Sequence, residues 1–314
     1  MKDQTDKFKT AREISGNIHG KRLLAYLPGM FTFNGLSGRY PALSITGNRC
    51  DLKCDHCMGT TLASMMDAGS PQTLLEKAIR LWEKGAHGIL ISGGSNKEGR
   101  LPWEKFIPFI KDIKQKTGLY ISLHSGLVDD TISIALKDAG VDQALIDIIG
   151  DDDTFKSIYH VDFGISRIIS SMESMIRAEI PIVPHVVCGL DHGRMKGEIR
   201  AIEIISGYKI EQLVVVSLMT IPGTPFWGME TPDPEEIADL IAEARLMMPE
   251  VPISLGCARK RGDVSLEIKA LEAGINRIAL PSEEVLDYAR QLGMEVKFQR
   301  TCCSVSRDFS GDEW

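Results

Sequence analysis

Short runs of Val, Ile and Leu alternate with longer, more polar segments along most of the chain. The apolar runs are nearly continuous, a pattern that is typical of parallel strands buried on both faces. The segments between them have the length of helices, and two of them begin with the helix-start sequences Ser70-Pro71 and Asp233-Pro234. The predicted strands cover residues 42–46, 88–92, 119–123, 143–148, 182–187, 212–218, 253–255 and 277–280.

Glycines end several of the predicted helices, at Gly85, Gly140, Gly274 and Gly293. Each can take the left-handed conformation that ends a helix before the next strand begins. Eight strand-like runs separated by helical patterns favour a β/α barrel, and a doubly wound open sheet is the alternative. We expect an N-terminal cap over residues 1–40, the barrel over 41–293 and a C-terminal tail over 294–314.

The charge and hydropathy of the chain exclude several classes of function. Its 314 residues carry 43 acidic and 36 basic side chains, a net charge of −7 with neutral histidine. An acidic chain without a basic tract is not expected to bind nucleic acid. No apolar run approaches the roughly 18 residues of a membrane span, and the first residues show no secretory signal.

Seven cysteines are unevenly placed in the chain. An odd number without a secretory signal argues against a disulfide framework. Cys50, Cys54 and Cys57 lie within eight residues, directly after the first of the predicted strands. Three thiolates on one tight loop can bind three irons of a cubane cluster and leave the fourth iron open. A zinc site, which needs further ligands elsewhere, and a chance grouping are the alternatives.

This CxxxCxxC motif after the first strand of a β/α array resembles the radical S-adenosylmethionine (SAM) superfamily. The resemblance covers about residues 40–285 and implies an α/β fold, the radical SAM β/α (TIM-like) barrel, full or nearly full. Gly93 and Gly94 resemble the glycine motif that binds the amino group of the cofactor, although Ser95 replaces the usual glutamate. His56 takes the position of an aromatic residue beside the adenine.

Later strand ends supply the other cofactor contacts that the resemblance implies. Asp147 and Asp151 take the place of polar groups that bind the ribose, and Gly189 and Leu190 resemble the adenine-contacting turn. The implied cofactors are a [4Fe–4S] cluster and SAM, which together generate a 5′-deoxyadenosyl radical for hydrogen abstraction. Because such a cluster works at low potential, the resemblance also implies a cytoplasmic protein in a reducing environment, with a ferredoxin or a flavodoxin as its electron donor.

The remaining cysteines distinguish among members of this superfamily. Cys302 and Cys303 lie in the tail, which we expect to fold over the barrel mouth, and Cys257 follows the seventh predicted strand. These three cysteines are the candidate ligands of a second iron–sulfur cluster. Cys188 is expected to be a small buried hydrophobe. Because adjacent side chains diverge in extended backbone, Cys188 is also kept as a replacement for one of the tail pair.

Segments such as Val183-Pro184-His185 and Leu255-Gly256-Cys257 resemble the biotin-synthase-like branch, which includes two-component lipoyl synthases found mainly in archaea. In that branch an auxiliary cluster is the sulfur donor. The implied function is sulfur insertion into an octanoyl chain. A lipoyl-type carrier protein and a second radical SAM subunit are the implied partners. One alternative is a single-cluster mutase, methylase or diiron-cofactor maturase. Another is a non-catalytic barrel scaffold or a metal-delivery partner, which the Ser95 substitution favours.

Three side chains at predicted strand ends are the candidates for catalysis. His124 and His185 can exchange protons, and a structural role is the alternative for each of them. Arg259, together with Arg261, can bind a carboxylate of the substrate or of the cofactor with two hydrogen bonds. A solvated rim is the alternative for these two arginines.

Overall fold

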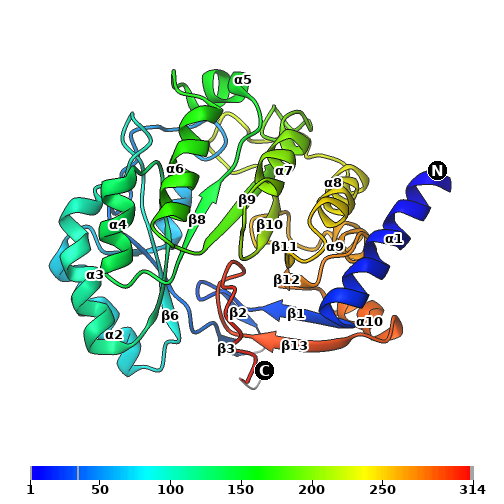
Figure 1. The fold of residues 1–314 in the computed structure, drawn as a ribbon, viewed down its shortest axis with the longest axis horizontal. Helices are drawn as coiled ribbons and strands as arrows, with labels where there is room; N and C mark the ends of the chain where they lie inside the picture. Colours follow the sequence, from blue (N-terminus) through cyan, green and yellow to red (C-terminus); the bar gives the residue numbers. More distant parts are fainter. Residues whose placement is uncertain (1, 34, 312–314) are drawn as a thin grey trace.

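A curled sheet of parallel strands forms the centre of the computed structural model, which describes residues 2–33 and 35–311 (Figure 1). The sheet has 11 strands in the order β13-β1-β12-β11-β10-β9-β8-β7-β6-β4-β5. The predicted strands are all present in this sheet and follow one another in the predicted order. Their bounds are β4 (Ala42–Ser44), β6 (Gly88–Ser92), β7 (Tyr120–His124), β8 (Gln143–Asp147), β9 (Ile182–Cys188), β10 (Leu213–Ser217), β11 (Ile253–Leu255) and β12 (Arg277–Ala279).

Three further strands extend the sheet beyond the predicted barrel: β1 (Arg22–Tyr26), β13 (Glu295–Gln299) and β5 (Met66–Asp67). Strand β1 pairs in parallel with both β12 and β13. The expected cap and the expected tail therefore each contribute a strand, and the boundaries at residues 40 and 293 do not delimit the sheet. The sequence of β13 alternates polar and apolar residues and is largely half-buried, so it lacks the continuous apolar run of an inner strand.

The barrel is nearly full. Within the described ranges the edge strands β5 and β13 do not pair with each other. The backbone of Arg39 bridges this gap, because its N–H donates to the carbonyl of Arg300 (2.6 Å) and its carbonyl accepts from the N–H of His87 (2.9 Å). The hairpin of β2 (Thr32–Phe33) and β3 (Leu36–Ser37) precedes this bridge and forms a separate small sheet.

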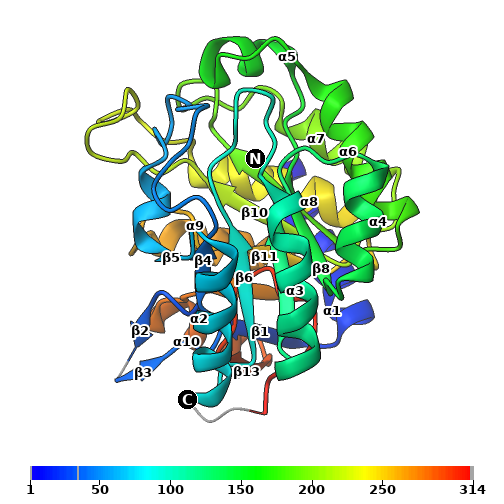
Figure 2. The same ribbon diagram turned by 90° about the vertical axis from the view of Figure 1, so that its left-hand side faces the viewer.

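Helices cover the outer face of the curled sheet (Figure 2). The glycines expected to end helices, Gly85, Gly140, Gly274 and Gly293, all have positive φ, between 73° and 94°. The longer helices are α1 (Lys2–His19), α2 (Pro71–Glu83), α3 (Trp103–Thr117), α4 (Asp130–Asp138), α6 (Ile165–Arg177), α7 (Glu198–Ser206), α8 (Pro234–Met247), α9 (Val264–Glu272) and α10 (Glu283–Gln291). No helix in the described ranges is long and apolar enough to cross a membrane.

The sheet separates two apolar layers, because successive side chains of a strand point to opposite faces. The larger layer packs between the strands and the helices. The smaller layer fills the inside of the curl. Its strand residues include Leu24, Leu90, Leu145, Val183, Val214 and Ala279, and it also contains Cys303 and Val305 of the C-terminal tail.

The tail after β13 turns into the curl from the amino-terminal ends of the strands (Figure 1, red). Its backbone carbonyls accept hydrogen bonds from Gln143, the first residue of β8, and from Gln212, which directly precedes β10. The expectation that the tail covers the mouth, at the carboxyl-terminal ends of the strands, is therefore wrong. The tail forms the floor of the barrel, because Gln143, Gln212 and Arg277, whose side chains donate hydrogen bonds to its backbone carbonyls, all lie at that end.

Candidate active site

The cysteine triplet lies on the loop that follows β4. Cys54 is buried, and Cys50 and Cys57 are half-buried. The loop is tight: the N–H groups of Cys57 and Met58 both donate to the carbonyl of Cys54, at 3.1 and 2.8 Å, and Lys53 and Met58 have positive φ. This backbone keeps the three thiols near one another, because the charges of Cys50 and Cys57 both act on the pKa of Cys54.

The electrostatics of the triplet fit a bound cationic cluster. Burial, together with the nearby Cys57 and Cys50 thiols, raises the pKa of Cys54. Burial also raises the pKa of Cys57. Three desolvated thiolates repel one another without a counter-ion, so a metal cluster is the group that would allow them to ionise together.

The glycine motif packs directly on the triplet loop. The N–H of Gly94 donates to Thr46 Oγ1 (2.8 Å), and the carbonyl of Ser95 accepts from the N–H of Asp51 (2.8 Å). A Cβ atom on Gly94 would lie 2.5 Å from the Cα of Cys50. The close approach leaves the backbone of this segment beside the thiols, where it can bind a cofactor group without help from the Ser95 side chain.

His56 carries a buried polar atom without a partner. Within the described residues its Nδ1 has no hydrogen bond, and its ring lies 5.3 Å from the ring of Tyr159. Burial lowers the pKa of His56 to about 4, so the imidazole is neutral. An orphaned nitrogen beside three thiols fits a site in which a bound cofactor supplies the missing hydrogen bond.

Polar side chains lie on the inner wall at the same end of the barrel. By strand alternation, Asp147 shares the inner face of β8 with Leu145, and His185 shares that of β9 with Val183. The rings of His124 and His185 are 5.6 Å apart. Burial raises the pKa of the Asp147 carboxyl and lowers the pKa of His124, while each of the two groups favours the charged form of the other.

Tyr159 joins this group, although it belongs to no motif in the sequence. Its hydroxyl is desolvated, and the neighbouring Asp147, Cys54 and Cys57 raise its pKa further. It ends η2 (Phe155–Tyr159), a π-helical turn that follows the short helix α5 (Asp152–Thr154). Aromatic residues in such a segment have many structural roles, so only the tertiary contact with the triplet reveals this one.

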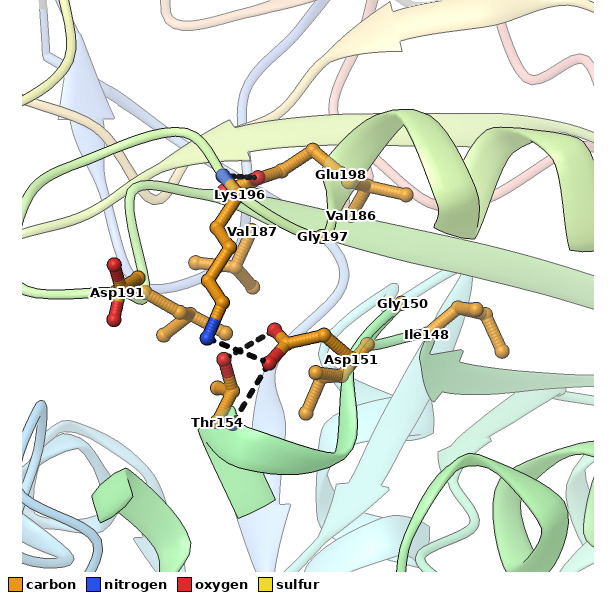
Figure 3. A pocket seen from close by; sticks show the side chains of 12 residues that line it. Ile148, Gly150, Asp151, Thr154, Val186, Val187, Asp191, Lys196, Gly197 and Glu198 are labelled. Atoms are coloured by element: carbon orange, nitrogen blue, oxygen red, sulfur yellow. Dashed lines mark hydrogen bonds and ion pairs between the residues drawn. The ribbon is translucent and has the colours of Figure 1, made fainter. Parts of the chain in front are cut away.

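A pocket between the ends of β8 and β9 is lined by two further predicted cofactor residues, Asp151 and Leu190 (Figure 3). Its apolar lining includes Ile148, Val187 and Leu190. Asp151 is used within the protein: its carboxylate caps α5 and pairs with Lys196 Nζ at 3.2 Å. This environment lowers the pKa of Asp151, although partial burial opposes the shift. Asp147 therefore has the freer carboxylate of the two candidates.

Glu198 holds the far wall of this pocket in place (Figure 3). Its buried carboxylate accepts from the backbone N–H groups of Gly189 (2.8 Å) and Lys196 (2.6 Å). Gly189 has φ of 89°, and a Cβ there would lie 2.6 Å from Pro232. The turn expected to contact adenine is thus fixed by one buried acid and one required glycine.

The three cysteines proposed for a second cluster come together inside the barrel. The Cys303 thiol is within hydrogen-bond reach of both Cys257 and Cys302, and it lowers the pKa of each; that of Cys302 falls to about 6. Cys302 Sγ also lies 3.2 Å from Ser304 Oγ. The adjacent pair can converge because the tail turns at Cys303 and is not extended. Within the described residues, neither cysteine trio is already arranged around a single metal ion.

Two other predicted residues lie elsewhere. Cys188 is fully buried, next to Glu198, and is not among the neighbours of the tail thiols. Arg259 is fully buried, where it pairs with Glu267 of α9 at 2.5 Å and donates to the carbonyl of Gly256. All of these partners belong to the β11–α9 connection and to α9. Arg259 is therefore engaged in packing α9 on the sheet, which its position at a strand end did not reveal.

Two family models match the chain: the radical SAM superfamily over residues 44–194, and the biotin and thiamin synthesis associated domain over residues 215–310. The biotin synthase of Pelotomaculum thermopropionicum is 24% identical over 284 residues, covering 86% of this chain and 81% of that protein. That of Xanthomonas euvesicatoria pv. vesicatoria is 27% identical over 247 residues, covering 75% and 70%. The crystal structure of methylornithine synthase (PylB) has the same fold, with a TM-score of 0.65, 14% identity and coverage of 93% and 89%.

The fold, the triplet and these matches define a radical SAM enzyme with a β/α barrel. The chain belongs to the radical SAM superfamily and, within it, to the biotin-synthase-like branch. A [4Fe–4S] cluster and SAM are accordingly its cofactors, as the sequence motif predicted.

Proposed function

We propose that this enzyme inserts sulfur into an aliphatic carbon chain, most specifically an octanoyl group. When bound, the cluster and SAM supply a 5′-deoxyadenosyl radical that can remove hydrogen from a carbon without polar activation. Each inserted sulfur replaces one C–H bond by one C–S bond, so the substrate carbon needs a sulfur source within van der Waals reach. The convergence of Cys257, Cys302 and Cys303 inside the barrel is the observation that carries this proposal.

The residues of the triplet end of the site bind and orient the cofactors. Cys50, Cys54 and Cys57 would ligate the first cluster, and the backbone of Gly93 and Gly94 would bind the amino group of SAM. Asp147 would accept hydrogen bonds from the ribose, because among the described residues no lysine or arginine pairs with its carboxylate as Lys196 pairs with Asp151. The side chain of Asp147 is exposed on the inner face of β8, where a bound ligand can reach it, and hydrogen bonds to a carboxylate are charge-assisted.

The adenine would lie between the apolar lining of the pocket after β9 and the neutral imidazole of His56. Leu190, which follows Gly189 in the turn, lines the pocket side of this subsite. The nitrogen of His56 that lacks a partner would gain one from the base. Neutral groups are suited to this role because adenine is uncharged.

The tail thiols would ligate a second iron–sulfur cluster that serves as the sulfur source. Hydrogen bonding to Cys303 lowers the pKa of Cys302 to about 6 and raises that of Cys303, so these thiols lose their protons as a group. The inner wall around these thiols is apolar and includes Leu90, Leu145 and Val214. Such a wall suits an alkyl chain and excludes water from a reactive carbon.

The substrate and the electrons would come from protein partners. The proposed octanoyl chain has no polar handle near its reacting carbons, which favours delivery on a small lipoyl-type carrier protein. A second radical SAM subunit would share the two insertions, and a ferredoxin or flavodoxin would reduce the first cluster. The floor of the barrel is closed by the tail, so the chain would enter from the mouth.

The decisive experiment counts iron and acid-labile sulfide in protein reconstituted without oxygen. The wild type should bind about eight irons per chain, and Cys302→Ala/Cys303→Ala about four, since each cubane contains four. Cys188→Ala removes a buried cysteine outside the tail site and should keep about eight. Four irons in wild type and double variant alike would contradict sulfur donation and favour a single-cluster mutase, methylase or maturase.

A Cys50→Ala/Cys54→Ala/Cys57→Ala variant tests the first site separately. It should lose the reductive cleavage of SAM to 5′-deoxyadenosine, while the wild type should cleave it under a strong reductant. Wild-type protein that binds SAM in equilibrium dialysis without cleaving it would instead support a scaffold or metal-delivery role.

A further inference from the structure

Two fully buried glutamines bind the segment of the tail that carries its two cysteines. Gln143 Nε2 donates to the carbonyl of Ser304 at 2.7 Å, and Gln212 Nε2 donates to the carbonyl of Cys303 at 2.7 Å. The glutamines belong to different strand beginnings, at β8 and just before β10. They therefore hydrogen-bond to one short segment of the tail from two sides of the barrel floor.

The orientation of both amides is fixed by their other partners. Gln143 Oε1 accepts from the Tyr120 hydroxyl (3.0 Å) and from the N–H of Ser306 (3.2 Å). Gln212 Oε1 accepts from the guanidinium of Arg277. With their oxygens committed to these donors, the two NH₂ groups must face the tail carbonyls.

A buried amide is costly unless its donors and acceptors are paired. Each glutamine achieves this pairing only with the tail in its present register. A shift of the tail by one residue would turn the carbonyls of Cys303 and Ser304 away from both amides. The same shift would move the thiols of Cys302 and Cys303 away from Cys257.

We propose that Gln143 and Gln212 are positioning residues for the second metal site. They set the register of the tail, so that two ligands from the end of the chain meet Cys257 from β11. The inference rests on the proposed function, because it assumes that these three thiols bind a metal cluster. Neither glutamine touches the metal; each acts through the backbone that carries the ligands.

Cobalt(II) is a suitable probe, because its thiolate complexes absorb in the near ultraviolet and visible ranges. The parent protein for the titration is Cys50→Ala/Cys54→Ala/Cys57→Ala, in which only the tail site retains three adjacent thiols. We expect this parent to bind one Co²⁺ with a thiolate charge-transfer band. Gln143→Met/Gln212→Met in the same background keeps the side-chain volume and removes both donors. Its Kd for Co²⁺ should be 10–100-fold higher, as is typical for residues that orient metal ligands.

Gln299→Met is the matched control. Gln299 is also fully buried and also bonds the tail, but it contacts Arg307 and Phe309, beyond the cysteines, and Thr301 before them. Its variant should change the Kd for Co²⁺ by less than the double variant does, and the charge-transfer band should keep its position. If the double variant does not fold, as judged by circular dichroism, the single variants Gln143→Met and Gln212→Met carry the same test.

The outcomes separate the two levels of the proposal. A parent that binds no Co²⁺ through thiolates contradicts the second metal site, and with it the proposed sulfur donation. If the parent binds Co²⁺ and the glutamine double variant binds it with the same Kd, only the positioning role is overturned. A control variant as weak as the double variant also overturns it, because general loosening of the tail would then explain the loss.

Discussion

Gly94 and Cys50 are in such close contact that a Cβ atom on Gly94 would lie 2.5 Å from both Cα and Cβ of Cys50. The same atom would be 2.1 Å from the carbonyl oxygen of Arg49. Backbone atoms cannot yield as a flexible side chain does, so the glycine is required by the path of the triplet loop. This contact couples the end of β6, where we propose that SAM binds, to Cys50, the first of the proposed cluster ligands.

Gly94→Ala should therefore displace the triplet loop. We expect at least a tenfold loss of SAM cleavage and incomplete loading of the first cluster, measured by product formation and iron analysis. Gly16→Ala is the control, because a Cβ at Gly16 in α1 would meet nothing within 4 Å. That change should leave cleavage unaltered and slightly stabilise the helix. Full activity in Gly94→Ala would contradict the coupling.

Asp147→Asn should weaken SAM binding, because an amide cannot accept the charge-assisted hydrogen bonds that a carboxylate accepts. A loss of about 1.5 kcal/mol corresponds to a roughly tenfold higher Kd. Equilibrium dialysis with labelled SAM measures this value. Asp151→Asn is the comparison: asparagine still caps α5, and the carboxylate it replaces already pairs with Lys196. Equal losses in both variants would mean that Asp147 has no special role.

Arg259→Met should destabilise the protein strongly, because it leaves the buried carboxylate of Glu267 without its partner. Breaking a buried ion pair typically costs about 3–5 kcal/mol. The midpoint of urea unfolding should fall accordingly. Arg259→Met/Glu267→Leu removes both charges and should recover most of the loss. If this double variant is stable yet no longer cleaves SAM, Arg259 also acts in the reaction, and packing alone does not describe its role.

His185 should make the folded protein sensitive to acid. Burial and the nearby His124 lower the pKa of His185 to about 3. Above pH 6.5 the imidazole is neutral in both folded and unfolded chains, so its titration does not change the free energy of unfolding. As the pH falls from 6.5 towards 3, the unfolded chain binds a proton that the folded protein rejects, and the free energy of unfolding decreases.

The expected contribution between pH 7 and pH 5 is about 2 kcal/mol. His185→Phe should remove it, so the difference between wild type and variant in the free energy of unfolding should narrow or reverse as the pH falls. His124 faces His185, and Asp147 faces His124; both titrate in wild type and variant alike. A constant difference across this range would show that His185 is not desolvated in the folded protein.

Local sequence patterns determined much of this protein. Continuous apolar runs specified the inner strands, because a strand buried on both faces excludes polar residues whatever its neighbours are. Four glycines specified helix ends, because a positive φ is a local requirement. The triplet was also a local feature, since three ligands within eight residues need only one loop to meet. The superfamily followed from that loop and from the strand before it.

Long-range contacts decided the rest. The direction of the tail depends on Gln143 and Gln212, whose hydrogen-bond partners in the tail lie 161 and 91 residues away along the chain. Nothing near Cys302 indicates that its segment enters the floor of the barrel and meets Cys257. The position of Arg259 at a strand end suggested that it binds substrate. Its partner Glu267 comes beside it only because α9 packs on the sheet, and the local sequence does not show that contact. Spacing along the chain predicts contacts within a loop or a helix turn, whereas contacts across a barrel are fixed only when the strands close around them.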